Sequence, residues 1–96
     1  APAMIEFSDG RYRVRGPVTL DTVQPLLEEG VQRFDGSDVR VDLSEVTGAD
    51  SSAVALLLAW TRAAALRGHR IRYENPTDSL RSLIELYELE ELLPHA

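Results

Sequence analysis

The sequence contains no cysteine and no lysine, and it has only two histidines. The absence of cysteine excludes disulfides, thiolate metal sites and a cysteine nucleophile. The absence of lysine excludes Schiff-base catalysis and the phosphate-binding Walker motif. All ten basic residues are therefore arginines, and sixteen acidic residues bring the net charge to −6. This balance argues against non-specific nucleic-acid binding, which needs a basic surface.

Long hydrophobic runs are missing as well. The longest nearly apolar stretch, residues 53–60, has eight residues, whereas a helix that spans a bilayer needs about 20. This stretch is internal, so it is not a signal peptide, and we expect a cytoplasmic protein without direct membrane insertion. The length of 96 residues predicts one domain over residues 1–96. We expect residues 1–3 to contribute nothing to the fold.

The turn signals and hydrophobic periodicity predict an alternation of strands and helices. The Asp9-Gly10 pair predicts a hairpin, because this dipeptide favours a two-residue turn. The expected strands are 5–7, 11–15, 39–43 and 71–73. The expected helices are 22–34, 51–66 and 78–87, and residues 90–93 are expected to form a last helical turn. Residues 44–50 are expected to form a loop. This order predicts an α/β fold, with one small mixed sheet of about four strands and three to four helices packed on it.

The second predicted strand alternates arginines with apolar residues. Tyr12 and Val14 are expected to face the core, which places Arg11, Arg13 and Arg15 in a row on the other face. Two interpretations of this row stay open. It is either an ordinary solvated strand face or a docking patch for another molecule.

The predicted helix over residues 51–66 has three unlike faces, instead of one apolar and one charged face. The first face suits packing on the sheet and contains Val54, Leu57, Leu58, Thr61, Ala64 and Ala65. The second is also apolar and contains Ala53, Leu56 and Trp60. The third is small and carries a single charge, and it contains Ser51, Ser52, Ala55, Ala59, Arg62, Ala63 and Leu66. Either the domain buries this third face itself, or a partner protein docks on it through Ser51, Ser52, Ala55, Ala59 and Arg62.

Ser51 is placed at the start of this helix, where free backbone N–H groups and the positive end of the helix dipole favour an anion. Phosphorylation would add about −1.5 to −2 charges there and change a docking surface of small neutral residues. Ser51 is therefore a candidate phosphorylation site. The alternative is that Asp50, Ser51 or Ser52 only caps the helix.

Residues 41–58 resemble the signature of STAS domains. That family typically reads Asp-Leu-Ser after a strand, and then Asp-Ser/Thr-Ser/Gly-Gly-Leu-Gly at the start of a helix. The corresponding segments here are Asp42-Leu43-Ser44 and Asp50-Ser51-Ser52-Ala53-Val54-Ala55. The resemblance covers nearly the whole chain, including the closing helix with Leu86-Tyr87-Glu88-Leu89. It implies a STAS-like single domain.

Within this family, the run at 55–58, the short length and the C-terminal segment are most similar to the MlaB-type subunit of the Mla phospholipid transporter. This resemblance implies a non-catalytic subunit that binds and supports the ATPase of an inner-membrane ABC complex with its permease. The subunit would be cytoplasmic and peripheral to the inner membrane through that complex. Its important hydroxyl residue falls on Ser51, although threonine is commoner in that group.

Anti-sigma-factor antagonists form the alternative within the family. They carry a phosphorylated serine at the position of Ser51, and their partner is an anti-sigma factor kinase. Ala53 and Ala55 stand where these antagonists usually have glycine, which favours the transporter subunit.

No arrangement of residues indicates catalysis. No nucleophile–base pair or pair of carboxylates with a plausible cleft is recognisable. His69 and His95 are isolated from other ligand types, so we expect no metal site and no cofactor.

Overall fold

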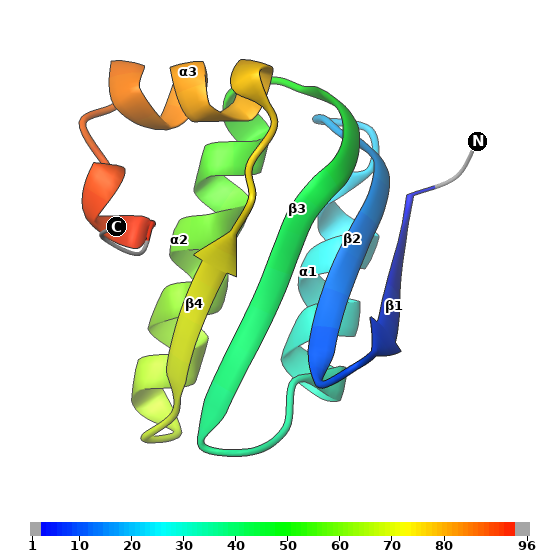
Figure 1. Ribbon diagram of the computed structural model, residues 1–96, viewed down its shortest axis with the longest axis vertical. Helices are drawn as coiled ribbons and strands as arrows, with labels where there is room; N and C mark the ends of the chain where they lie inside the picture. Colours follow the sequence, from blue (N-terminus) through cyan, green and yellow to red (C-terminus); the bar gives the residue numbers. More distant parts are fainter. Residues whose placement is uncertain (1–2, 94–96) are drawn as a thin grey trace.

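The computed structural model describes residues 3–93, and it has the predicted order of strands and helices (Figure 1). The elements are β1 (Met4–Ser8), β2 (Arg11–Val18), α1 (Val23–Arg33), β3 (Asp38–Ala49), α2 (Ser51–Leu66), β4 (Arg70–Glu74), α3 (Asp78–Leu86) and the 3₁₀ turn η1 (Glu90–Leu92). The predicted α/β class and the last helical turn are confirmed.

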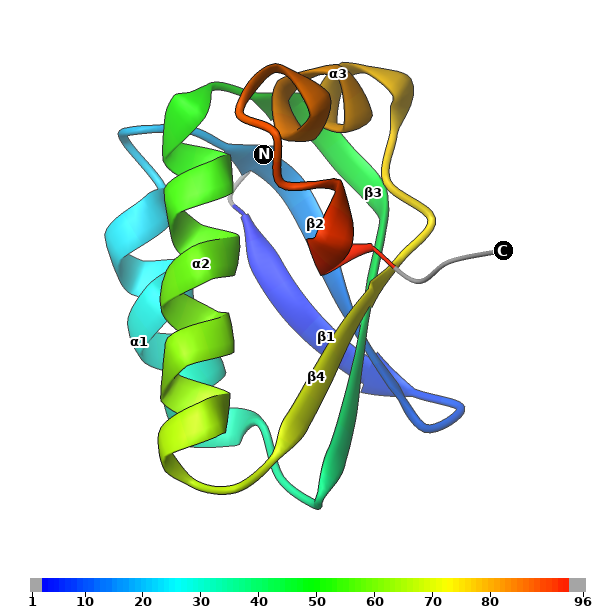
Figure 2. The same ribbon diagram turned by 90° about the vertical axis from the view of Figure 1, so that its left-hand side faces the viewer.

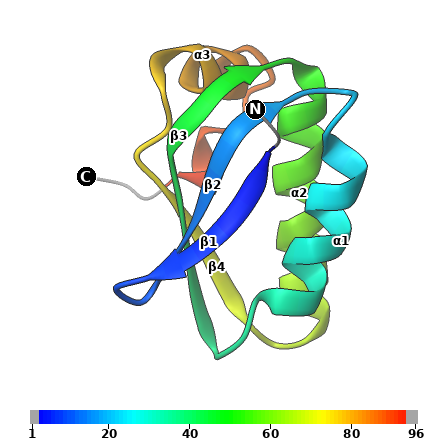
Figure 3. The same cartoon turned by 90° about the vertical axis from the view of Figure 1, so that its right-hand side faces the viewer.

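The four strands form one mixed sheet in the order β1-β2-β3-β4. β1 and β2 are antiparallel, whereas the pairs β2–β3 and β3–β4 are parallel. Asp9 and Gly10 both have positive φ angles, of 53° and 75°, as a tight hairpin turn requires. Figures 2 and 3 show that α1 and α2 lie side by side on one face of the sheet, while α3 lies near one end. No helix among residues 3–93 covers the opposite face.

Two strand ends differ from the prediction. β3 continues to Ala49, so the loop expected over residues 44–50 is wrong, and β2 continues through Gly16 and Pro17. The register between these strands skips twice, and each time β3 contains one extra residue. Such bulges interrupt the alternation of polar and apolar side chains that marks a strand in the sequence. They also tolerate a proline inside a sheet.

The N-terminal residues contribute more than was expected. Ala3 packs against the hydrophobic core and Met4 is the first residue of β1. The predicted core positions Tyr12 and Val14 are buried. The core lies between the sheet and the helices, and it also includes Leu80 and Ile84 of α3.

The two long helices approach each other closely at Gly30 of α1 and Trp60 of α2. A Cβ atom on Gly30 would lie 2.3 Å from Nε1 of Trp60. The same Nε1 donates a hydrogen bond to the carbonyl of Leu27 at 3.3 Å. The indole ring also packs edge-on against Phe34, with ring centroids 4.9 Å apart. Trp60 is only 1% exposed, so this contact fixes the distance between the helices.

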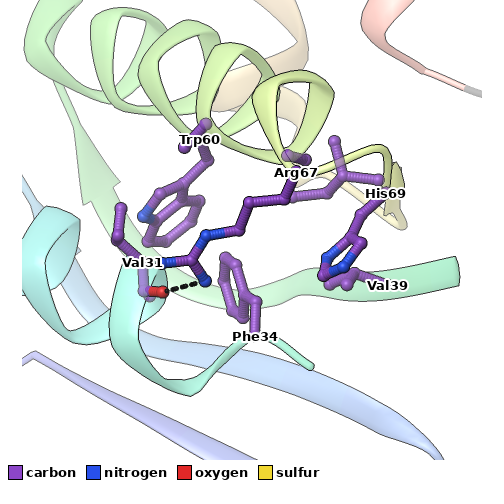
Figure 4. A pocket seen from close by; sticks show the side chains of 10 residues that line it. Val31, Phe34, Val39, Trp60, Arg67 and His69 are labelled. Carbon is purple, nitrogen blue, oxygen red and sulfur yellow. Dashed lines mark hydrogen bonds between the residues drawn. The ribbon is translucent and has the colours of Figure 1, made fainter. Parts of the chain in front are cut away.

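A small cavity remains beside this contact (Figure 4). Its volume of about 20 Å³ is enough for about one water molecule. Arg67 reaches across from α2 and donates a hydrogen bond to the carbonyl of Val31 at 3.1 Å. This carbonyl belongs to the last turn of α1, where backbone acceptors lack partners within the helix. Arg67 therefore caps α1 from the neighbouring helix.

Candidate functional site

The candidate site is the outward face of α2, which begins directly after the carboxyl end of β3. Ligand and partner sites of α/β folds form at this place, near helix N-termini. The structure brings the five predicted residues together on one face, where Ser51, Ala55 and Arg62 are exposed and Ser52 and Ala59 are half-buried. We call these five residues the docking surface. Their role in binding a partner stays a prediction.

The docking surface points outward because the other two faces of α2 are mostly packed inside the domain. Ala53, Leu56 and Trp60 are buried, as are Val54 and Leu57. One assignment of the helical wheel is wrong, because Ala65 is exposed instead of packed on the sheet. It lies next to Leu66, which is 90% exposed. None of the described residues therefore covers this side of the last turn of α2.

Asp50 fixes the start of α2. Its Oδ1 atom accepts a hydrogen bond from the backbone N–H of Ser52 at 2.8 Å, so Asp50 is the N-cap residue. Its Oδ2 atom accepts a second hydrogen bond from the backbone N–H of Leu20 at 3.1 Å. One carboxylate therefore joins the β2–α1 loop to the α2 N-terminus. The capping alternative thus falls on Asp50, and Ser51 is left exposed.

Leu20 is a candidate site residue that the sequence analysis did not select. Its side chain is 76% exposed, and its backbone is bound to the residue that precedes Ser51. The segment around it is polar, and it folds through Thr22, whose Oγ1 accepts from the N–H of Thr19 and donates to the carbonyl of Pro17. A lone large apolar residue within such a turn is the signal that could have indicated it.

Asp42, from the first segment of the STAS signature, lies on the opposite side of the sheet from the docking surface. Asp42 is buried, and it accepts hydrogen bonds from the N–H of Ser44 at 2.9 Å and from Nε of Arg13 at 3.1 Å. It projects from the face that no helix of the described residues covers. Burial alone would raise the pKa of Asp42, but these hydrogen bonds outweigh it and lower the pKa. Asp42 therefore stabilises the fold, away from the docking surface.

The pKa of Asp50 is also lowered, first by the hydrogen bond from the N–H of Leu20 and further by the one from Ser52. A lowered pKa in the folded state stabilises the fold above the ordinary value of 3.8, and this contribution is lost as the pH falls through that range. We expect the free energy of unfolding, measured by urea denaturation from about pH 6 to about pH 2.5, to decrease with falling pH. The variant Asp50→Asn keeps a capping side chain and should show a weaker decrease. An identical pH profile would contradict this role of Asp50.

Comparisons with known proteins agree with this geometry. A family model described as Mlab, STAS domain matches residues 4–94. The chain belongs to the STAS domain family. This confirms the family resemblance of the signature around α2. No curated protein matches the chain significantly.

Solved structures of STAS domains share the fold. SpoIIAA, an anti-sigma factor antagonist in its unphosphorylated form, superposes with a TM-score of 0.76 at 17% identity, over 98% of this chain and 87% of its own. The phosphorylated form of SpoIIAA from Bacillus has a TM-score of 0.66 at 17% identity, over 98% and 90%. An anti-sigma factor antagonist from Mycobacterium paratuberculosis has a TM-score of 0.66 at 21% identity, over 96% and 81%. At these identities the likeness shows a shared fold.

Among residues 3–93 of this STAS domain, no helix has the length and apolar character needed to cross a membrane. STAS domains are generally non-catalytic, which fits a site formed by small side chains. What this surface offers chemically is a contact area of small side chains with a hydroxyl group at one end, because Ser51 is exposed and Ala55 and Ala59 follow it along α2.

Proposed function

We propose that this STAS domain is a non-catalytic subunit that binds the ATPase of an inner-membrane ABC transporter for phospholipids through its docking surface. The subunit would support the assembly and activity of the ATPase. It would stay in the cytoplasm and reach the membrane only through the complex with the permease. The observation that carries the proposal is the exposed face of small residues on α2, in a chain that matches the family model described as Mlab.

The chemistry of this face supports docking by another protein. A solvent-exposed helix face usually carries charged side chains, whereas the docking surface carries only Arg62. Small side chains permit close approach of a second backbone. Leu20 adds a large exposed apolar group, and its backbone is hydrogen-bonded to Asp50, the residue before Ser51. Such a residue is a suitable anchor for a pocket on the partner.

The alternative function is an anti-sigma-factor antagonist that is switched by phosphorylation of Ser51. The fold of two such antagonists supports it. Ser51 is exposed at the N-terminus of α2, where the helix dipole would stabilise a phosphate. The neighbouring carboxylate of Asp50 opposes a second negative charge at this point. Stoichiometric phosphate on Ser51 after incubation with an anti-sigma factor kinase and ATP, measured by intact mass, would favour this function over the transporter subunit.

The variant Ala55→Arg tests the docking surface. A long charged side chain at the centre of a close contact should weaken capture of the transporter ATPase about tenfold or more. The matched control is Ala65→Arg, which places the same side chain on an exposed position of the same helix outside the docking surface. We expect Ala65→Arg to capture the ATPase as the native chain does, when both are assayed by copurification and checked by circular dichroism. Equal capture by the two folded variants would show that the interface lies elsewhere.

A further inference from the structure

The face of the sheet that no described helix covers carries a row of three arginines on β2. Arg11, Arg13 and Arg15 occupy every second position, so they project from the same face. Six of the ten arginines of the chain lie on this face, whereas it holds five of the sixteen acidic residues. The remainder of the chain has four arginines against eleven acidic residues. The arginines are therefore concentrated opposite the helices, on the side away from the docking surface.

The sequence alone left open whether this row is merely solvated, and the structure shows that it is ion-paired. Nε of Arg11 lies 3.1 Å from Glu74, Nε of Arg13 lies 3.1 Å from Asp42, and Nε of Arg15 lies 2.8 Å from Glu6. All three closest contacts use the Nε atom. A guanidinium has five N–H donors, so it can donate to a second carboxylate from its two Nη atoms.

The exposed fractions of these side chains show which groups a partner would meet. The arginine side chains are 37%, 29% and 46% exposed for Arg11, Arg13 and Arg15. The acids beneath the first two are less exposed, at 17% for Glu74 and 6% for Asp42. A molecule that approaches the centre of this face therefore meets guanidinium groups before it meets carboxylates.

We propose that the row Arg11, Arg13 and Arg15 binds an extended polypeptide segment with an acidic side chain at every second residue. Side chains on one face of an extended chain repeat at about 6.5–7 Å, which matches the spacing along β2. Each carboxylate of the segment would form a forked contact with the Nη edge of one arginine.

The other charges on this face favour a polypeptide over a membrane or a nucleic acid. Glu6 and Glu45 border the row, since Glu6 pairs with Arg13 and Glu45 with Arg15 in the strand register. Asp38 lies on the same face farther away, where it is ion-paired with Arg72 of β4. A uniformly anionic lipid surface or a phosphate backbone would place negative charge over these carboxylates too. A polypeptide can place neutral or basic residues there, and acidic ones only over the arginines.

The test uses the full chain and two labelled peptides of about ten residues with the same composition. In one peptide glutamate alternates with threonine, and in the other the glutamates form a block. Fluorescence anisotropy at about 20 mM salt, where surface charges are little screened, should show about fivefold tighter binding of the alternating peptide. Equal binding of the two peptides, or no binding of either, would overturn the proposal.

The variant Arg15→Gln identifies the site, because Arg15 and Glu6 are both about half exposed and no buried charge loses its partner. It should weaken binding of the alternating peptide about fivefold, the effect expected for one exposed charge pair. Arg11→Gln is the second variant of the row, and Arg81→Gln on α3 is the matched control that should bind normally. Equal weakening by all three variants would overturn the proposal. Phosphatidylglycerol vesicles provide a further test. If the vesicles bind in a way that depends on Arg15 while the alternating peptide does not bind, the proposal is overturned.

Discussion

Replacing Gly30 with alanine should lower the free energy of unfolding by about 2–3 kcal/mol, in the upper part of the range typical of overpacking a core. Helix propensity predicts the opposite sign, because alanine in the interior of a helix is favoured over glycine by about 1 kcal/mol. The structure decides between these effects. The new Cβ atom would lie 2.3 Å from Nε1, 2.5 Å from Cε2 and 2.8 Å from Cζ2 of Trp60, so α1 and α2 would have to move apart.

Thermal or urea denaturation measures this change, and we expect the Tm of Gly30→Ala to fall by about 10–20 °C. Gly48→Ala is the matched control. A Cβ atom at Gly48 meets no other atom within 4 Å, so this variant should stay within about 0.5 kcal/mol of the native chain. A Gly30→Ala variant as stable as the native chain would show that the helices have room to adjust.

The glycine contact illustrates what the sequence could not predict. Gly30 interrupts a good helical pattern, and its reason lies 30 residues away at Trp60. The α2 faces were predicted well, because a 3.6-residue period specifies which side chains share a side. The pattern assigned the first face to the sheet, but it could not show that Trp60 of the second face meets α1, because that contact joins elements far apart in the sequence.

The candidate site was partly predictable for the same reason. The five residues of the docking surface are close in sequence, and the helical period brings them together. Leu20 was missed because its link to the start of α2 is a hydrogen bond from its backbone N–H to Asp50, 30 residues away in the sequence. The length of β3 was underestimated because its two bulges place Ser44, Glu45 and Thr47 outward in an irregular order.

The largest loss of stability should follow Trp60→Ala. The indole is 1% exposed, packs against Phe34 and donates to the carbonyl of Leu27. Removal of a buried tryptophan ring costs about 3–5 kcal/mol through lost burial and the cavity that remains. This is a large part of the roughly 5–15 kcal/mol that stabilises a typical domain. Trp60 is the only tryptophan, so urea denaturation of this variant is followed by circular dichroism.

The double variant Gly30→Ala/Trp60→Ala separates the two explanations of the Gly30 effect. If the indole ring is what excludes a Cβ atom from Gly30, alanine at this position no longer clashes once Trp60 is removed. Its helix propensity then stabilises α1 by up to about 1 kcal/mol, so the double variant should be at least as stable as Trp60→Ala alone. The resulting coupling energy of about 3 kcal/mol is at the upper end for residues in contact. If Gly30→Ala destabilises both backgrounds equally, the glycine is required by α1 itself and the proposed contact with α2 is not the cause.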